Sequence, residues 1–282
     1  MNDVFQQNEH QQLLITSWMD QFDGLVAGFT TRLGGCSQAP FNSHNLGLHV
    51  NDNPDDVIQN RKLLAERLGF SFDTFTCAEQ IHHHVVANVT KQEIGKGRLS
   101  VDDTIKGADG IVTSEKGVLL VSFYADCVPL FFVDPHKKVI ALAHAGWKGT
   151  VGAIAKETIH KMVSEYGCEV ASIRAVIGPA IDVCCYEVDE KVILAIKTMW
   201  LKEKLPESLL SACIKPINEK KAYINLKEIN RQIMIKAGIL STHLEISKLC
   251  TGCSTDLFFS HRMEQGKTGR MASFIGWQER EI

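Results

Sequence analysis

The sequence lacks the features that would place the protein in a membrane or outside the cell. No apolar stretch in its 282 residues approaches the roughly 20 residues that a membrane-spanning helix needs. Residues 1–10 are polar and contain no apolar core of a signal peptide, so we expect a cytoplasmic protein that does not bind membranes. The nine cysteines are odd in number and accompany no secretion signal, which argues against a disulfide framework.

The chain also has little excess charge of either sign. Its 30 Lys and Arg residues against 33 Asp and Glu residues leave a formal net charge of −3, which provides no overall attraction for nucleic acid, and we expect none as a partner. Internal repeats and Pro- or Ser-rich linkers are missing too. The most linker-like stretch, 92–106, is short enough for a surface loop, so we expect a single domain over 1–282. None of these features predicts the oligomeric state.

Helical and strand patterns are mixed along the chain without a strict rhythm. Asn53-Pro54, followed by two aspartates, is typical of a helix start, and the apolar spacing that follows stops at Gly69. Further helices are predicted over 151–166 and 226–237, each ended by a glycine. Apolar runs predict strands over 117–124, 130–133, 139–145, 173–177 and 271–275. The pattern predicts an α/β (α+β) fold other than a simple doubly wound sheet.

Polar residues with reactive side chains stand at the ends of these apolar runs. Cys127 ends one predicted strand, and His144 lies where another runs into a glycine-flanked turn. If the strands on either side of Asp134-Pro135 pair as a hairpin, Cys127 and His144 come to the same end of it. A histidine triplet at 82–84 leads into a further apolar pair.

Cysteine and histidine in this arrangement predict a catalytic transition-metal site. A thiolate and an imidazole are good zinc ligands, and three protein ligands leave one position open for chemistry. In an extended segment His82 and His84 face one side and His83 the other, so register alone does not choose the third ligand. Asp126 either orients a ligand or moves a proton. The structural alternative is that Cys127 fills the core and His144 is a satisfied polar residue.

The residues around this constellation resemble the YfiH-type family, also described as laccase-domain or multicopper polyphenol oxidase proteins and as purine nucleoside phosphorylases. The resemblance includes the Q-I-H, A-D-C and H-A-G-W motifs at 80–82, 125–127 and 144–147. The other matching segments, in chain order, are 28–35, 45–49, 60–61, 108–110, 177–181, 186–188, 230–231, 250–251, 258–262 and 268–273. The resemblance implies a mixed β-sandwich flanked by helices, similar to the catalytic domain of a cytotoxic necrotizing factor.

The same resemblance implies the metal ligands and the reaction. The ligands are expected to be His82, Cys127 and His144, holding zinc (Zn2+) or copper (Cu2+), although His83 follows the first of them where the family usually has glycine. The expected activity is phosphorolysis of adenosine, inosine and methylthioadenosine, with deamination of adenosine to inosine. Purine nucleoside and phosphate are thus the expected partners. Zinc lowers the pKa of a bound water, which suits deamination, with Glu79, Asp126 or Cys127 as proton carriers.

Phosphate and nucleoside need cationic and polar partners. The candidates in the matching segments are Arg32, Asn45, Gln80, Lys148, Arg262 and Arg270. Gly146 and Gly149, ahead of a helix expected to begin near Thr150, offer backbone N–H groups to phosphate; a tight turn is their structural alternative.

Three other functions remain open at this point. A copper-dependent polyphenol oxidase (laccase) would need several copper sites and repeated H-x-H motifs, which the chain lacks outside the triplet. A metal-free hydrolase would use Cys127 as nucleophile and His144 as base. A binding scaffold would hold structural zinc at Cys184-Cys185 and Cys250-x-x-Cys253, although adjacent cysteines rarely both bind one ion.

Overall fold

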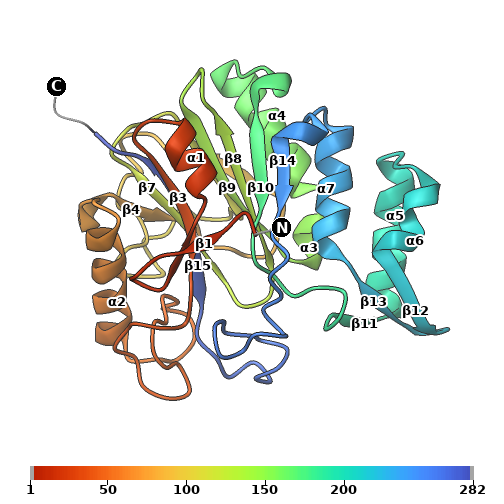
Figure 1. The fold of residues 1–282 in the computed structure, drawn as a ribbon, viewed down its shortest axis with the longest axis horizontal. Helices are drawn as coiled ribbons and strands as arrows, with labels where there is room; N and C mark the ends of the chain where they lie inside the picture. Colours follow the sequence, from red (N-terminus) through yellow and green to blue (C-terminus); the bar gives the residue numbers. More distant parts are fainter. Residues whose placement is uncertain (1–2, 280–282) are drawn as a thin grey trace.

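Two six-stranded β-sheets form the centre of the computed structural model, which describes residues 3–279 (Figure 1). The first sheet has the strand order β1-β2-β3-β15-β7-β4, and the second has the order β14-β10-β8-β9-β6-β5. A small third sheet has the order β11-β13-β12. The strands are Gln6–Gln7 (β1), Gln12–Leu14 (β2), Leu25–Thr30 (β3), Phe75–Cys77 (β4), Val86–Asn88 (β5), Gly110–Thr113 (β6), Leu119–Tyr124 (β7), Val128–Asp134 (β8), Val139–Ala145 (β9), Arg174–Ile177 (β10), Glu187–Asp189 (β11), Ile214–Asn218 (β12), Lys221–Ile224 (β13), Leu244–Ile246 (β14) and Met271–Trp277 (β15).

Helices cover both outer faces of the paired sheets. The α-helices are Thr16–Gln21 (α1), Pro54–Arg67 (α2), Trp147–Val151 (α3), Ile154–Tyr166 (α4), Glu190–Lys202 (α5), Leu210–Cys213 (α6) and Leu226–Lys236 (α7). In Figure 1, α2 lies on one side of the sheets, and α4 and α7 lie on the other. The small sheet, with α5 and α6, extends beyond α7. The expected mixed β-sandwich flanked by helices is confirmed.

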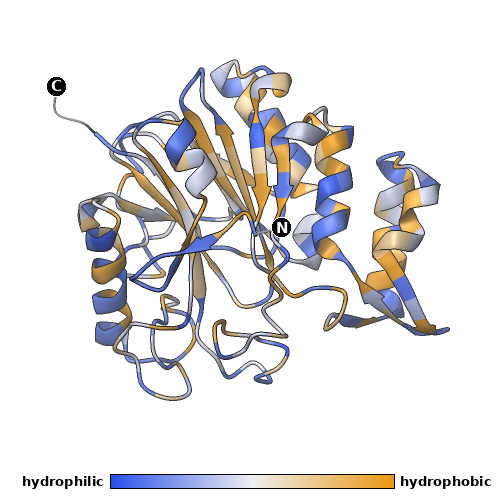
Figure 2. Ribbon diagram, viewed as in Figure 1, coloured by the Kyte–Doolittle hydropathy of each residue, from blue (hydrophilic) through white to orange (hydrophobic). Residues whose placement is uncertain are grey.

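Three apolar clusters hold these layers together. One fills the space between the two large sheets, with side chains such as Phe29 and Ile275 from the first meeting Phe131 and Leu142 from the second. Another packs the second sheet against α4, α5 and α7, and a third packs the first sheet against α2. The central strands are accordingly apolar along their length, whereas α2 carries both polar and apolar residues (Figure 2). Burial of this apolar area is the main favourable term in folding.

Local sequence signals explain the boundaries of α2. The Asn53 side chain accepts a hydrogen bond of 3.0 Å from the Asp55 N–H, and Pro54 occupies the first helical position. Gly69 follows the last turn with φ of 73°, a conformation that glycine adopts without steric cost. The helix predicted from these residues is confirmed.

The helix predicted over 151–166 is only partly confirmed. Ala153 takes a left-handed conformation with φ of 55°, and this residue separates α3 from α4. The prediction missed the break because the apolar spacing of 151–166 continues through it, and spacing reports which face is buried rather than where the backbone turns. Helix α3 begins at Trp147, earlier than the start expected near Thr150, so Gly149 lies inside it and only Gly146, its N-cap, stands ahead of it.

The predicted hairpin around Asp134-Pro135 is confirmed as the β8–β9 pair. Its antiparallel register pairs Asp134 with Val139 at the turn and Pro129 with His144 at the other end. Cys127, directly before β8, therefore comes to the end of the hairpin that carries His144. Within residues 3–279, no helix has both the length and the apolar character that crossing a membrane requires.

Candidate functional site

The predicted cysteine and histidines meet where the chain crosses between the two large sheets. Cys127 lies in the short connection from β7 in the first sheet to β8 in the second. His144 is the penultimate residue of β9, next to β8. His82 comes from the loop that joins β4 of the first sheet to β5 of the second. Two connections between the sheets and one strand end thus each bring one side chain to a common point.

The three side chains lie within ligand distance of one ion. One donor atom from each of His82, Cys127 and His144 lies within 4.8 Å of the others. The two imidazole rings meet edge to face, with centroids 4.8 Å apart. His83 and His84 instead stack on each other at 4.4 Å, outside this cluster. The structure therefore brings His82, and not its two neighbours, to Cys127 and His144.

A buried carboxylate, Asp109, fixes two of these residues. Its Oδ1 lies 3.0 Å from Nδ1 of His144 and also accepts a 2.8 Å hydrogen bond from the His82 backbone N–H. Its Oδ2 accepts a 2.7 Å bond from the His83 N–H. The contact at Nδ1 leaves Nε2 of His144 free to point at the cluster, as in carboxylate–histidine–metal arrangements. Asp109 stands directly before β6, which pairs with β9, so the sheet itself sets this geometry.

The backbone of the histidine segment is not extended. Gln80 and His82 have φ of 59° and 63°, values that side-chain-bearing residues rarely adopt, so the alternation of an extended segment does not describe the triplet. The bonds from the His82 and His83 N–H groups to Asp109 stabilise this conformation. Asp126 has φ of 84° beside Cys127. Such conformations often gather at functional sites.

Cys127 and His144 stabilise each other in their charged forms. Partial burial alone would raise the pKa of the Cys127 thiol, but His144 and His82 outweigh it and lower the pKa to about 6. Burial alone would lower the pKa of His144, but Cys127 and Asp109 raise it to about 9. The arrangement therefore favours a thiolate, the form of cysteine that binds metals and attacks electrophiles.

A cavity of about 550 Å³ opens beside the cluster, a size typical of sites for small ligands. His82, Cys127 and His144 all line it. Aromatic side chains add flat apolar surface to the wall, and cationic and polar groups complete it. The other lining residues that carry this argument are Phe123, Trp147, Tyr186, His49, Glu79, His261, Arg262 and Arg270.

Of the four predicted cations, two face the cavity. Arg262 lies over the Tyr186 ring, and its Nη1 donates a 2.6 Å bond to the Glu187 carbonyl. Arg270 lines the wall, and its Nη1 donates to the carbonyls of Thr268 and Gly269. Gln80 also lines the cavity, but its amide exchanges two 2.8 Å bonds with the Phe123 backbone.

The other predicted substrate-binding residues lie elsewhere. Arg32 forms a 3.0 Å ion pair with Glu264 and a 2.7 Å bond to the Thr255 carbonyl, away from the described cavity lining. Lys148 is exposed on α3, outside that lining.

Asn45 supports the cavity wall from behind. Its Oδ1 accepts a 2.8 Å bond from the Arg270 N–H, although Asn45 itself is not among the described lining residues.

An added Cβ at Gly149 would approach the carbonyls of His144 and His83 at 3.1 and 3.2 Å. Gly149 therefore permits close packing of α3 against these two carbonyls.

The Asp126 carboxylate bonds to neighbouring loops and does not orient Cys127. Its Oδ1 accepts bonds of 2.7 and 2.8 Å from the hydroxyls of Thr251 and Ser260, and its Oδ2 accepts a 2.7 Å bond from the Arg262 N–H. The carboxylate that contacts a ligand histidine is Asp109, whereas the sequence left Asp126 open between orienting a ligand and moving a proton. Sequence reasoning missed Asp109 because 35 residues separate it from His144; its place in the matching segment 108–110 was the available signal.

The residues present fit a bound transition metal. The donor set is one thiol and two imidazoles, and a carboxylate orients one of the imidazoles. Gly146 keeps the space clear, since an added Cβ would lie 3.0 Å from Cys127 Sγ and 3.4 Å from His82 Cδ2. A metal at this point would have an open side toward the cavity.

Comparison with known proteins agrees with this architecture. Residues 26–278 match the family described as multi-copper polyphenol oxidoreductase laccase. The chain belongs to this family. It is 41% identical to the purine nucleoside phosphorylase YlmD of Bacillus subtilis over 95% of both chains, and 41% identical to YlmD of Geobacillus stearothermophilus over 99% of both.

Solved structures similar to this chain have the same fold. The hypothetical protein YfiH of Bacillus licheniformis superposes with a TM-score of 0.92 at 41% identity, over 98% of this chain and 100% of that one. YlmD of Geobacillus stearothermophilus gives a TM-score of 0.92 at 40% identity, over 99% and 100%. The Neisseria meningitidis protein NMB0706 gives 0.76 at 30%, over 91% and 96%.

Proposed function

We propose that this family member is a zinc-dependent purine nucleoside enzyme that acts in the cavity beside His82, Cys127 and His144. The proposed reactions are phosphorolysis of adenosine, inosine and methylthioadenosine, and deamination of adenosine to inosine. The observation that carries the proposal is this metal-type donor set, with Asp109 behind it, on the wall of a ligand-sized cavity. The relatives named purine nucleoside phosphorylase support the substrate class.

In the proposed phosphorolysis, a phosphate oxygen bonds to C1′ of the ribose as the bond from C1′ to the purine nitrogen breaks. The bonding electron pair leaves with the purine, which takes up a proton, and the products are free base and ribose 1-phosphate, or methylthioribose 1-phosphate from methylthioadenosine. The chain's own groups suit these needs. Arg262 and Arg270 offer cations to phosphate, and Phe123, Trp147 and Tyr186 offer flat surfaces to a purine. Zinc would supply Lewis-acid chemistry at His82, Cys127 and His144.

Among the proton carriers considered from sequence, Asp126 fits least, because three hydrogen bonds already engage its oxygens. Glu79 lines the cavity, but its carboxylate accepts from the Gly107 N–H and pairs with Lys106. Cys127 faces the cavity and has a depressed pKa.

Chromatography of adenosine incubated with the protein, with and without phosphate, tests the proposal. Phosphate-dependent adenine that disappears in Cys127→Ala would support phosphorolysis at this site, and inosine formed without phosphate would support deamination. Cys36→Ala is the matched control, because Cys36 is exposed and lies outside the described cavity lining. Unchanged adenosine under all conditions would contradict the proposal.

A metal-free cysteine hydrolase is the second candidate, and one observation favours it. Cys127, His144 and Asp109 stand in the order of a nucleophile, a base and an orienting carboxylate. Turnover that survives complete metal removal would favour the hydrolase over the zinc enzyme. A laccase is less compatible, because only one of the two metal-type clusters among the described residues contains histidine.

A further inference from the structure

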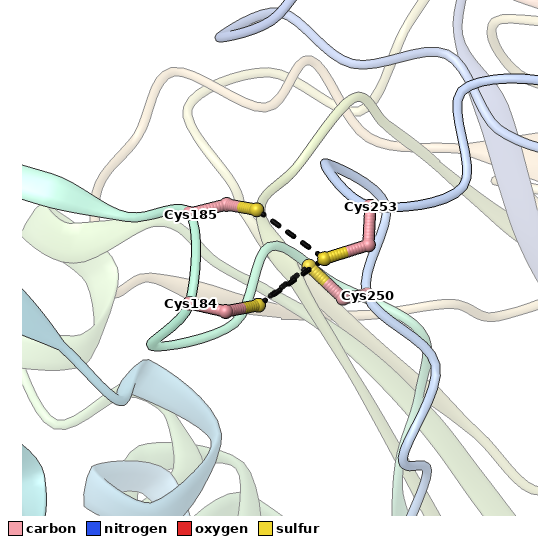
Figure 3. A group of neighbouring side chains, drawn as sticks. All are labelled: Cys184, Cys185, Cys250 and Cys253. Atoms are coloured by element: carbon pink, nitrogen blue, oxygen red, sulfur yellow. Dashed lines mark hydrogen bonds between the residues drawn. The ribbon is translucent and has the colours of Figure 1, made fainter.

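Four cysteine thiols form a second cluster, separate from the cavity. Cys184 and Cys185 lie in the connection from β10 to β11, and Cys250 and Cys253 lie in the segment after β14. All four sulfur atoms lie within 4.8 Å of one another. Figure 3 shows the two pairs pointing toward each other from facing loops. The sequence disfavoured this site because adjacent cysteines rarely share an ion, but here both members of the adjacent pair point inward.

The sulfur separations suit thiolates around an ion. Cys184 Sγ lies 3.6 Å from Cys250 Sγ and 3.3 Å from Cys253 Sγ, and Cys185 Sγ lies 3.4 Å from Cys253 Sγ. Tetrahedral zinc with bonds of about 2.3 Å would place its sulfur ligands about 3.8 Å apart. A disulfide would need a separation of about 2.05 Å. The observed distances lie much nearer to the zinc geometry.

Backbone contacts bring the two cysteine-bearing loops together. Strands β10 and β14 are parallel neighbours, and the pairing continues past them through a bridge between Ala180 and Cys250. The Asp182 N–H donates to Cys250 Sγ over 3.3 Å, a contact that stabilises a thiolate. At Gly252 an added Cβ would lie 2.9 Å from Cys185 Cβ, so this glycine permits the close approach.

A buried cation lies beside the cluster. Lys227 is 3% exposed, and its Nζ lies 2.5 Å from Asp182 Oδ2 and donates to the Ser247 and Leu249 carbonyls. It therefore crosslinks the two loops that carry the cysteines.

We propose that Cys184, Cys185, Cys250 and Cys253 bind one structural zinc ion. Four thiolates fill the tetrahedral shell and leave no open position, in contrast to the three-ligand set at the cavity. The ion links the two cysteine-bearing loops, and both loops reach the cavity. Ile181 and Tyr186 of the first loop line it, and Thr251 of the second donates the 2.7 Å hydrogen bond to Asp126. The proposal does not depend on the reaction catalysed there.

Zinc stoichiometry in a Cys127→Ala background isolates this site. The full chain is equilibrated with zinc chloride under reducing conditions and desalted, and bound zinc is measured by elemental analysis. Cys127→Ala is expected to retain one zinc per chain, and adding Cys253→Ser or Cys184→Ser is expected to remove it. Adding Cys36→Ser, at an exposed cysteine outside the cluster, is expected to leave one zinc in place.

Cobalt provides a readout that does not require the cluster variants to fold. Co2+ bound to Cys127→Ala is expected to show intense thiolate-to-cobalt charge-transfer absorption, because four sulfur ligands remain. Absence of zinc from Cys127→Ala, or absence of this absorption, would overturn the proposal. So would retention of the zinc in both cluster variants, or a disulfide between cluster cysteines in the protein isolated with alkylated thiols.

Discussion

Asp109 Oδ1 lies 3.0 Å from Nδ1 of His144, and both side chains are almost wholly buried. Burial by itself would raise the pKa of the Asp109 carboxyl, but the contact with His144 and the N–H groups of His83 and His82 lower it. Asp109 is thus a buried carboxylate that fixes the ring of one proposed ligand and the backbone of another. It positions ligands without facing the cavity.

Asp109→Asn should weaken zinc binding at the cavity by about 10–100-fold, because carboxylates behind ligand histidines contribute on that scale. The amide is nearly isosteric but no longer stabilises the ring and both backbone donors as an anion does. The measurement is a zinc competition titration against a chromophoric chelator, with the cysteine cluster removed by Cys253→Ser.

Asp134→Asn is the matched control for that change. Asp134 is also buried, but it caps the opposite end of the β8–β9 hairpin, where its Oδ1 accepts from the N–H groups of His136 and Lys137. We expect this variant to keep its zinc affinity. Equal losses in both variants would indicate general loosening of the fold and would count against a positioning role for Asp109.

The histidine triplet provides a second prediction. His82→Ala should reduce zinc affinity at the cavity by more than about 100-fold, since it removes a ligand and not merely its support. His83→Ala and His84→Ala should change it less than about threefold, because these two rings stack on each other outside the cluster. The same titration measures all three variants, and a dominant effect at His83 or His84 would exclude His82 as the third ligand.

The cluster at the cavity shows which parts of the site local sequence can predict. Cys127 and His144 could be placed together because pairing outward from the Asp134-Pro135 turn brings both to the same end of the hairpin. The shape of the triplet could not be predicted, since it depends on the N–H bonds to Asp109, a residue 27 positions away from His82. Local patterns report burial and turns, whereas this conformation is set by a tertiary contact.

The cations illustrate the same limit. Arg32 and Arg270 look alike in sequence, but Arg32 finds its partners more than 220 positions away, at Thr255 and Glu264. In these contacts the Arg32 guanidinium is paired with Glu264 and links distant loops, so it is not free to bind phosphate. The layers of the fold were more predictable, because the runs of apolar residues mark strands buried on both faces.

Gly146 provides a third prediction. Its φ of −64° and ψ of 175° suit any residue, so Gly146→Ala should fold normally. The added methyl group would lie 3.0 Å from Cys127 Sγ and should reduce zinc affinity at the cavity by about tenfold or more through crowding. Thermal unfolding verifies the fold, and the chelator competition measures the affinity.

Gly152→Ala is the comparison for this change. Its Cβ would meet the ring of His84 at 2.7 Å, away from the three proposed ligands. We expect the strain to affect stability and not zinc affinity. Unchanged zinc binding in Gly146→Ala would contradict Cys127 as a ligand of the cavity-side zinc.

Arg270 provides the last prediction, which rests on the proposed phosphorolysis. Arg270→Ala should raise the KM for phosphate by about 10–100-fold, the effect expected when a charge-assisted hydrogen bond worth about 1.5–3 kcal/mol is lost. The carbonyls of Thr268 and Gly269 also lose a donor, so thermal unfolding must accompany the kinetics. Arg270→Lys should recover only part of the affinity, because lysine keeps the charge but lacks the planar fork. Lys215→Ala, at an exposed lysine of β12 outside the described cavity lining, should leave the KM unchanged. A fall in kcat at constant KM for phosphate would instead assign Arg270 to the transition state or to the nucleoside.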